Sequence, residues 1–325
     1  MKVTEHISKA KKSLFSFEIL PPIRGNDIKD IFSTLDPLME FNPPFIDVTY
    51  HREEFVYIDK GNGLLQRKKI SKRPGTVGIC SAIMNKYKVD AVPHLICGGF
   101  NKQMTENALI DLNFLGIDNV LVLRGDPIKH ENKFFAKKDG HKYAVDLVKQ
   151  VKNLNSGIYI DKNFIDNNNT NKKESPIFDF CIGVAGYPEK HLEAPNIESD
   201  LFFLKKKVEA GANYIVTQMF FDNKKYFSFV EKCRIEGISV PIIPGIKPIS
   251  SIQHLNSLPS KFYLSIPNEL VKEIEKTKNK KNVFHIGIEW SINQSKELRN
   301  SGVEVIHYYT MDKPENIYQI VQSIF

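Results

Sequence analysis

The nonapeptide Leu14–Pro22, LFSFEILPP, has the pattern of a short buried strand that carries one carboxylate and then stops. With a side-chain period of two, the residues divide between two faces: Phe15, Phe17 and Ile19 on one, and Leu14, Ser16 and Glu18 on the other. The two prolines end the strand, because proline donates no ladder hydrogen bond. A lone acid here has two explanations: an exposed or ion-paired rim carboxylate, or a proton donor inside the mouth of a barrel.

The bulk composition is that of an ordinary globular protein. The chain has 325 residues, of which 42% are hydrophobic and 26% charged, and this length suits one α/β barrel with insertions. No apolar run of roughly 18 residues exists and the lysine-bearing N-terminus lacks an apolar segment, so we expect neither a membrane span nor a secretory signal. The four scattered cysteines fit a reducing cytoplasm better than a disulfide framework.

The formal net charge of +7 limits the class of partner. The lysines are mostly interspersed with acids, and no basic stripe is interleaved with aromatic residues, so nucleic acid is not an expected partner. A polyanionic small ligand fits this charge better. His94 and Cys97 have no neighbours at metal-ligand spacing, so no metal site is predicted.

Apolar segments alternate with helical patterns along the chain. The predicted strands are Leu14–Leu20, Phe45–Tyr50, Val89–Cys97, Asn119–Arg124, Phe178–Gly186, Tyr214–Gln218, Val240–Ile246 and Val303–Thr310. The predicted helices are Asp27–Glu40, capped by Asn26 or Asp27, then Ile58–Lys72, Thr105–Leu115, Gly140–Asn153, Ile197–Ala210, Lys224–Glu236, Val283–Asn300 and Pro314–Phe325, with two short ones within Ser250–Lys281. The asparagine-rich segment Asn155–Pro176 is a predicted polar insertion.

This alternation predicts parallel pairing through right-handed crossovers. About eight such units close into a (β/α)8 TIM barrel, which we predict as a single domain spanning residues 1–325. An open doubly wound sheet would use the same elements. However, neither GxGxxG after the first strand nor GxxxxGK[ST] is present, so the usual nucleotide-binding motifs do not support that alternative.

Polar side chains stand where the predicted strands end, and in a barrel these ends share one rim, where barrel enzymes carry their active sites. They are Glu18, Thr49, Tyr50, His94, Arg124, Asp126, Tyr187, Gln218, Gly245, Lys247 and Tyr309. Each has a plainer explanation: His94 could be a satisfied core histidine, and Arg124 and Asp126 could pair with each other. Their convergence on one rim favours a site.

A set of motifs, in matching order and spacing from Ser16 to about Lys313, resembles the methylenetetrahydrofolate reductase family. The motifs are SFEILPP (16–22), VTY (48–50), PHL (93–95), LRGD (123–126), YPEKH (187–191), TQMFFD (217–222) and PGIKP (244–248). The chain resembles the short bacterial form, without the regulatory domain of eukaryotic members. Relatives are often homo-oligomers.

The resemblance implies a flavoenzyme in which FAD, reduced by NADH or NADPH, passes hydride to 5,10-methylenetetrahydrofolate. It implies that Glu18 is the general acid that protonates N10 of the folate, and that Asp126 lies beside the flavin, contacts the pterin and stabilises the cationic iminium. Gln218 would bind the folate and the nicotinamide in turn, and Thr49 would contact the nicotinamide nucleotide. A carboxylic acid on a barrel wall can stay protonated near neutral pH through desolvation.

The resemblance also implies a set of FAD-binding positions. They are Tyr50, His94, Arg124, Gly125, Asp126, Ala144, Tyr187, His191, Ala194, Asp200, Lys206 and Lys207. Asp200 and Lys207 lie about two turns apart on one face of their helix, which suits a ribose hydroxyl and a diphosphate. For the lysines 205–207, a solvated helix face is the plainer alternative.

Three positions depart from the family pattern and put the folate-tail contacts in doubt. Arg52 stands where a small residue is common, Lys313 replaces an arginine and loses its bidentate fork, and His254 replaces a glutamine. Two rival functions use the same scaffold: another flavin-dependent barrel oxidoreductase of one-carbon metabolism, and a flavin-binding subunit that needs a partner for electrons.

Overall fold

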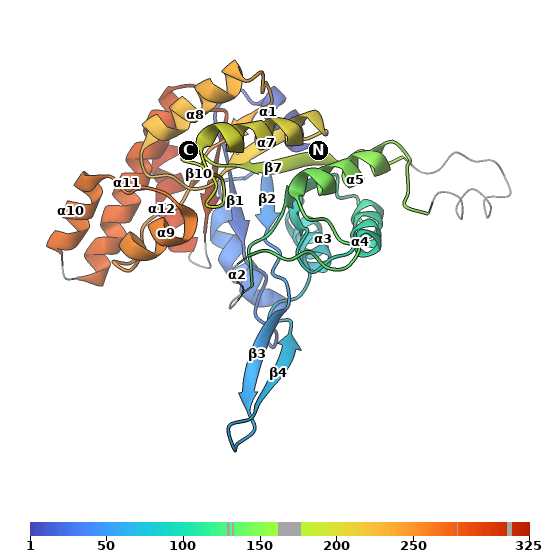
Figure 1. Cartoon of the computed structure of the whole chain (residues 1–325). Helices are drawn as coiled ribbons and strands as arrows, with labels where there is room; N and C mark the ends of the chain where they lie inside the picture. Colours follow the sequence, from blue (N-terminus) through green and yellow to red (C-terminus); the bar gives the residue numbers. More distant parts are fainter. Residues whose placement is uncertain (129–130, 132, 162–176, 278, 311–313) are drawn as a thin grey trace.

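The structure is a computed structural model that describes residues 1–128, 131, 133–161, 177–277, 279–310 and 314–325. Within them, nine parallel strands form a nearly closed barrel in the order β10-β11-β1-β2-β5-β6-β7-β8-β9, which confirms the predicted barrel (Figure 1). The strands are β1 Leu14–Ile19, β2 Phe45–Val48, β5 Asp90–Ile96, β6 Asn119–Leu123, β7 Cys181–Gly186, β8 Tyr214–Thr217, β9 Ile242–Ile243, β10 Gly245–Ile246 and β11 Val305–Tyr309.

The predicted seventh strand is present as two short pieces. Pro244 lies between β9 and β10, and it has no N–H for a ladder. β9 pairs with β8, whereas β10 pairs with β11. The break therefore falls where the two ends of the strand order meet.

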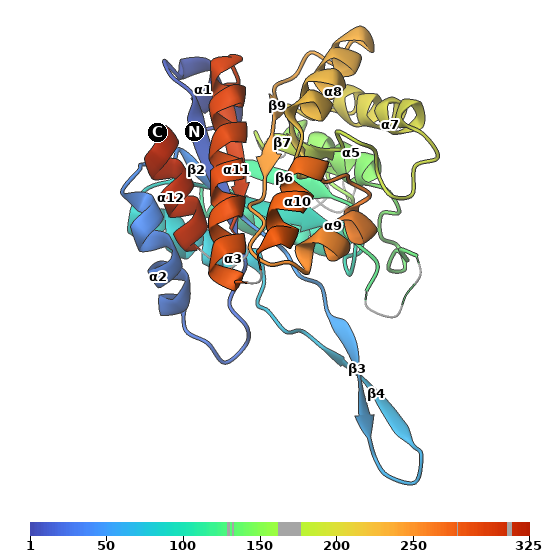
Figure 2. The ribbon, with the colours of Figure 1, turned by 90° about the vertical axis from the view of Figure 1, so that its left-hand side faces the viewer.

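Helices surround the barrel (Figures 1 and 2). They are α2 Ile28–Met39, α3 Thr76–Tyr87, α4 Lys102–Phe114, α5 Ala144–Asn155, α7 Ile197–Glu209, α8 Asn223–Ile235, α9 His254–Phe262, α10 Asn268–Lys276, α11 Lys280–Asn300 and α12 Pro314–Ile324. Asp27 caps α2 by accepting a hydrogen bond from the Lys29 N–H, as one of the two predicted caps. The two predicted short helices are α9 and α10, whereas α3 was not predicted. No helix in the described residues is long and apolar enough to cross a membrane.

The residues of β1 divide between two faces as predicted. Phe15, Phe17 and Ile19 are buried in the large cluster between the strands and the surrounding helices. The barrel interior near its amino-terminal end holds a second apolar cluster, which includes Phe45 and Tyr214. The mouth lies at the opposite end, where the strands terminate.

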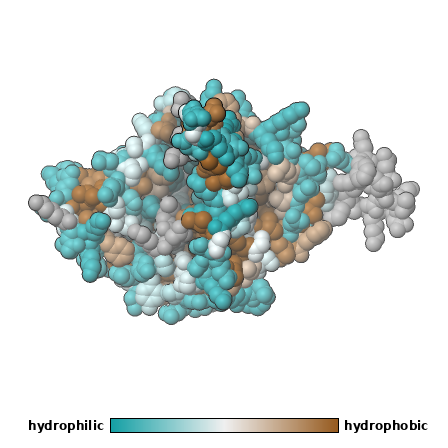
Figure 3. Space-filling view, turned by 90° about the horizontal axis from the view of Figure 1, so that it is seen from below, coloured by the Kyte–Doolittle hydropathy of each residue, from teal (hydrophilic) through white to brown (hydrophobic). Residues whose placement is uncertain are grey.

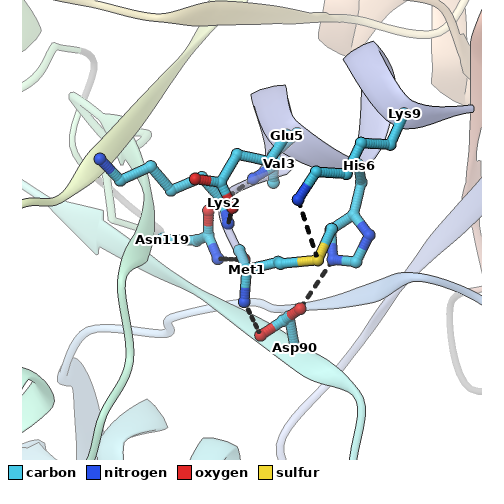
Figure 4. Close-up of polar contacts among 8 residues, drawn as sticks. All are labelled: Met1, Lys2, Val3, Glu5, His6, Lys9, Asp90 and Asn119. Carbon is cyan, nitrogen blue, oxygen red and sulfur yellow. Dashed lines mark hydrogen bonds and ion pairs between the residues drawn. The ribbon is translucent and has the colours of Figure 1, made fainter.

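An unpredicted helix, α1 (Val3–Lys9), lies across the amino-terminal end of the barrel (Figure 4). Val3 is fully buried in the interior cluster, and its N–H donates to Asn119 at 2.8 Å. The His6 ring and the Met1 amino group both contact the carboxylate of Asp90, at 2.7 and 2.8 Å. This end of the barrel is thus closed, and the mouth is the end available for a ligand.

The prediction of a helix at Ile58–Lys72 is wrong. The chain instead forms an antiparallel hairpin of β3 (Glu54–Asp59) and β4 (Leu65–Ile70), which projects from the body (Figures 1 and 2). At its tip Gly61, Asn62 and Gly63 have φ of 82°, 53° and 75°, left-handed values that a helix excludes. The Asn-Gly pair between β-branched and aromatic residues was the available signal.

The predicted insertion Asn155–Pro176 lies mostly outside the described residues. Its first residue, Asn155, ends α5, and its side chain exchanges two hydrogen bonds with the backbone of Phe180, each 2.9 Å long.

Two helical glycines provide a matched stability test. A Cβ on Gly287 in α11 would overlap the carbonyl oxygen of Ile249, whereas a Cβ on Gly78 in α3 would meet nothing within 4 Å. We expect Gly287→Ala to lower the free energy of unfolding by about 1–3 kcal/mol through overpacking. Gly78→Ala should raise it by about 0.5–1 kcal/mol through helix propensity. Urea unfolding followed by circular dichroism measures both, and equal effects would contradict the close approach.

Candidate active site

Glu18 lies at the carboxyl end of β1, facing the barrel interior near the mouth. Its side chain is 12% exposed, and its Oε2 lies 4.0 Å from Nε2 of His94 on β5. The strand register places Glu18 beside Tyr309 on β11 and Asp47 on β2. Glu18 is therefore a buried carboxyl inside the barrel, and the exposed-rim explanation is wrong.

Burial raises the pKa of Glu18 from its ordinary 4.5 to about 7, because the carboxylate loses its hydration. His94 and Lys247 act against this shift, whereas the negative charge of Asp47 adds to it. At neutral pH Glu18 thus carries a proton in a large fraction of molecules. A carboxylic acid in this state can donate that proton to a basic ligand atom.

The interior side chains beneath Glu18 are polar, whereas an apolar layer would be expected inside a barrel. Asp47 and His307 have 1% of their side chains exposed and His94 has 7%. His94 Nε2 lies 3.5 Å from Asp47 Oδ2, and His307 Nδ1 shares a 2.8 Å hydrogen bond with Ser16 Oγ. The sequence analysis missed Asp47 and His307. The signal was available: an acid within an otherwise apolar strand, two residues before Thr49 and hence on the same inward face.

At the end of β6, Arg124 forms a bidentate ion pair with Glu193, with N–O distances of 2.6 and 2.7 Å. Its guanidinium also lies 5.2 Å from the centre of the Phe134 ring, and Arg52 lies 5.6 Å from the same ring. The alternative that Arg124 pairs with Asp126 is therefore not what the structure shows. No strand or helix pattern marks Glu193, which is why the sequence analysis missed it.

The end of β7, the segment that follows it and helix α7 bring four more predicted residues together. The ring of Tyr187 stacks edge-on against His191 at 4.8 Å, and the His191 N–H donates to Asp200 at 2.9 Å. Lys207 donates to the carbonyl of Ala185 at 2.5 Å, and burial lowers the pKa of its ammonium to about 8, an effect that Asp200 opposes. A buried cation with so few partners can bind an anionic ligand group.

Three other predicted residues lie after the ends of β2 and β6. Gly125 has φ +84°, and a Cβ there would lie 3.4 Å from the Ile96 side chain, so glycine fits this turn. The Tyr50 ring stacks against Phe100 at 5.1 Å. Thr49 Oγ1 lies 3.2 Å from the His51 ring nitrogen.

The remaining predicted residues are more scattered. Gln218 follows β8 and accepts a hydrogen bond from the Met219 N–H, Ala144 begins α5, the Ala194 carbonyl accepts from Lys190, and His254 begins α9. Lys206 forms a 2.7 Å ion pair with Glu209 on the exposed side of α7, away from the buried Lys207. Lys313 lies outside the described residues. Seen from the hairpin side, the surface is mainly hydrophilic with scattered hydrophobic residues (Figure 3).

The family model described as methylenetetrahydrofolate reductase matches residues 2–324. The chain belongs to this family. It is 32% identical over its whole length to methylenetetrahydrofolate reductase (NADH) 1 of Arabidopsis thaliana, and 30% identical over 98% of its length to a probable NADPH enzyme of Caenorhabditis elegans. These matches cover 51% and 43% of the two relatives, so the chain spans about half the length of the curated relatives it matches.

Two further similarities agree with membership of the methylenetetrahydrofolate reductase family. The chain is 28% identical to the 5,10-methylenetetrahydrofolate reductase of Pectobacterium carotovorum, over 95% of this chain and 89% of that protein. Its fold matches an uncharacterised protein of Clostridium thermocellum that binds two copies of 5-methyl-5,6,7,8-tetrahydrofolic acid, with a TM-score of 0.56 at 12% identity. That match covers 99% of this chain and 98% of the other, and it supports the barrel fold.

The residues present fit the flavin that members of the methylenetetrahydrofolate reductase family generally use. Lys207 and Arg124 supply two cations here, and the ammonium of Lys207 donates to the Ala185 carbonyl and interacts with Asp200. Gly125 lets the backbone turn closely after β6. Among the described residues, no group of three or more His, Cys, Asp or Glu side chains could hold a metal ion.

Proposed function

We propose that this chain uses NADH or NADPH and FAD to reduce 5,10-methylenetetrahydrofolate to 5-methyltetrahydrofolate. The observation that carries the proposal is the buried Glu18 carboxyl at the mouth of a barrel of this family, where burial raises its pKa to about 7. A folate whose five-membered ring must open needs a proton at N10. Glu18 is a group on the barrel wall that can deliver one at neutral pH.

In this proposal Glu18 is the catalytic acid. Its O–H bond breaks as an N–H bond forms at N10 of the folate, and the ring opens to a 5-iminium cation. FAD, held by the residues at the ends of β6 and β7, would supply the hydride chemistry that connects the nicotinamide nucleotide to this cation. Each turnover therefore removes one proton from Glu18, which must be replaced before the next.

The other predicted substrate contacts have separate roles in the proposal. Asp126, beside Arg124 and Tyr187 at the mouth, stabilises the iminium cation through its negative charge. Gln218 exchanges hydrogen bonds with the folate and the nicotinamide in turn, and Thr49 contacts the nicotinamide nucleotide. His254 and Lys313 contact the folate tail.

Binding of FAD falls to the residues around the ends of β6 and β7. Lys207 and Arg124 carry the positive charge that a diphosphate requires, and Asp200 accepts from a ribose hydroxyl. In the described structure the carboxylate of Glu193 accepts hydrogen bonds from both terminal nitrogens of the Arg124 guanidinium. A phosphate oxygen would therefore compete with that carboxylate. Tyr50, His94, Gly125, Ala144, Tyr187, His191, Ala194 and Lys206 are the remaining proposed contacts.

The proposed function is tested by measuring the two half-reactions of the purified protein separately. Flavin bleaching on addition of NADH or NADPH reports the first, and recovery of flavin absorbance on addition of 5,10-methylenetetrahydrofolate, with 5-methyltetrahydrofolate as product, reports the second. Named relatives differ in their nucleotide, so both nucleotides are compared. Flavin reduction without folate-dependent reoxidation would favour the rival barrel oxidoreductase. Bound flavin that neither nucleotide reduces would favour the partner-dependent subunit.

The pH dependence of the second half-reaction follows from the pKa of Glu18, which is raised to about 7. The acid is protonated below that pH, so we expect a constant rate of folate-dependent flavin reoxidation on the acidic side. On the alkaline side the rate should fall about tenfold per pH unit. Stopped-flow absorbance measures it, and flavin reduction by the nucleotide, which needs no proton from Glu18, is the internal control. A profile without this break near pH 7 would contradict the assigned pKa.

A further inference from the structure

Four neighbouring strands direct polar side chains into one layer of the barrel interior, directly beneath Glu18. These side chains are Ser16 of β1, Asp47 of β2, His94 of β5 and His307 of β11, and all are buried. On the opposite side of the barrel the facing residues are Leu121 and Gly183, and the buried hydroxyl of Tyr214, which also has no hydrogen-bond partner in the part of the chain that the structure describes, lies against Gly183. A polar half-layer inside a barrel is unfavourable for stability alone, since branched apolar residues normally fill it.

Within the described residues, this layer leaves several polar atoms without hydrogen bonds. Both carboxylate oxygens of Asp47 are in this state, and so are Nε2 of His94 and Nε2 of His307. Each such buried atom destabilises the fold unless a partner or an ordered water satisfies it. Their retention in one cluster, in contact with the catalytic acid, indicates a role in the reaction.

The distances show how Asp47 can reach Glu18. His94 Nε2 lies 3.5 Å from Asp47 Oδ2 and 4.0 Å from Glu18 Oε2, so one nitrogen of the imidazole faces both carboxyl groups. His307 is held by Ser16, and burial lowers its pKa to about 4, so its ring is neutral at physiological pH. His94 is therefore the group that links Asp47 to the acid.

We propose that Asp47 is a positioning residue for the reaction, which holds the His94 ring against Glu18 and thereby governs the protonation of Glu18 through that ring. The inference rests on the proposed role of Glu18 as the acid. Asp47 itself touches neither substrate nor flavin in this proposal. It lies beside Glu18 in the register of β1 and β2, and its Oδ2 is 3.5 Å from His94 Nε2.

The direction in which Asp47→Asn changes the pKa of Glu18 distinguishes this proposal from a direct effect of the Asp47 charge. The charged groups that face Glu18 are His94 from β5, Asp47 from β2, Lys247 after β10 and Tyr309 from β11. His94 lowers the pKa of Glu18 by more than Asp47 raises it. If Asp47 acted only directly, Asp47→Asn would lower that pKa. If it acts through His94, the variant no longer holds the imidazole against Glu18, so the larger effect of His94 is lost as well and the pKa of Glu18 rises.

The test is an infrared titration of the folded protein. The carbonyl stretch of the protonated Glu18 carboxyl is followed against pH, and Glu18→Gln identifies the band. We expect Asp47→Asn to move the titration to higher pH by on the order of 1 unit. Asp47→Ser should act in the same direction, and it provides the comparison if the amide variant does not fold. A shift to lower pH, or none, would overturn the proposal.

A double-mutant cycle then tests the link through His94. His94→Gln should reproduce the upward shift, and Asp47→Asn combined with His94→Gln should add little to it, because both changes remove one pathway. Additive shifts would overturn the link. Ser295→Ala, which removes the buried hydrogen bond from Tyr308 on the helix-facing side of β11, is the matched control and should leave the titration unchanged.

The two half-reactions provide a further test, because a purely structural role of Asp47 would affect both of them equally. Asp47→Asn should move the alkaline fall in the rate of folate-dependent flavin reoxidation to higher pH by on the order of 1 unit and leave flavin reduction by the nucleotide unchanged. Equal loss of both would make Asp47 structural. Because the infrared titration needs no turnover, failure of the inference is distinguishable from failure of the proposed function, which would appear as absent folate reduction in the unmodified protein.

Discussion

Glu18→Gln is expected to abolish folate reduction while sparing reduction of the flavin by NADH or NADPH. Glutamine keeps the size of the side chain but cannot supply a proton, and positioned general acids contribute on the order of 10²- to 10⁴-fold to a rate. Reduction of the flavin transfers a hydride and takes no proton from this position. Stopped-flow flavin absorbance measures each half-reaction, so the loss should fall on the second alone.

Stability can be separated from chemistry in this variant. The Glu18 side chain is buried and lies 4.0 Å from His94, so the neutral amide should not weaken the fold, since it removes a group whose charged form is disfavoured there. An unfolding midpoint close to that of the unmodified protein is the control. Should both half-reactions fall together in a folded variant, Glu18 would be a structural residue.

Lys207→Met is expected to produce the second large effect, a loss of flavin affinity of about 10- to 150-fold. The ammonium of Lys207 is buried at the end of β7, and a charge-assisted hydrogen bond to a phosphate oxygen contributes about 1.5–3 kcal/mol. Methionine keeps the length and apolar stem of lysine but removes the charge. Quenching of flavin fluorescence on titration with apoprotein gives the dissociation constant directly.

Lys205→Met is the matched control for this measurement. Lys205 lies on the same helix with its side chain 40% exposed, and its amino group is 3.9 Å from Glu236. Exposed pairs of this kind contribute little, so its removal should leave flavin affinity unchanged. Equal weakening by both variants would indicate a general effect of charge instead of a contact at Lys207.

Much of the barrel follows from local patterns. The alternation of phenylalanines with Ser16 and Glu18 gave the correct inward and outward faces of β1, because side-chain direction in a strand depends only on sequence parity. The prediction of Asp27 as a helix cap was also correct, because the capping hydrogen bond joins it to Lys29, two residues further along the chain, and so depends on local sequence alone. The hairpin β3–β4 was the failure: a helix was predicted over Ile58–Lys72, whereas the left-handed turn at Gly61, Asn62 and Gly63 forms a hairpin.

The sequence by itself determined which residue types stand at the strand ends, and through the family motifs it pointed to the acid, the substrate and the cofactor. Only the tertiary structure decided what each of them meets. Glu18, Asp47 and His94 are far apart along the chain, and their cluster arises from the register of β1, β2 and β5. The pairing of Arg124 with Glu193 likewise depends on a loop. Burial, and with it the raised pKa of Glu18, is a property of all the strands that surround the carboxyl, so no local stretch of sequence could specify it.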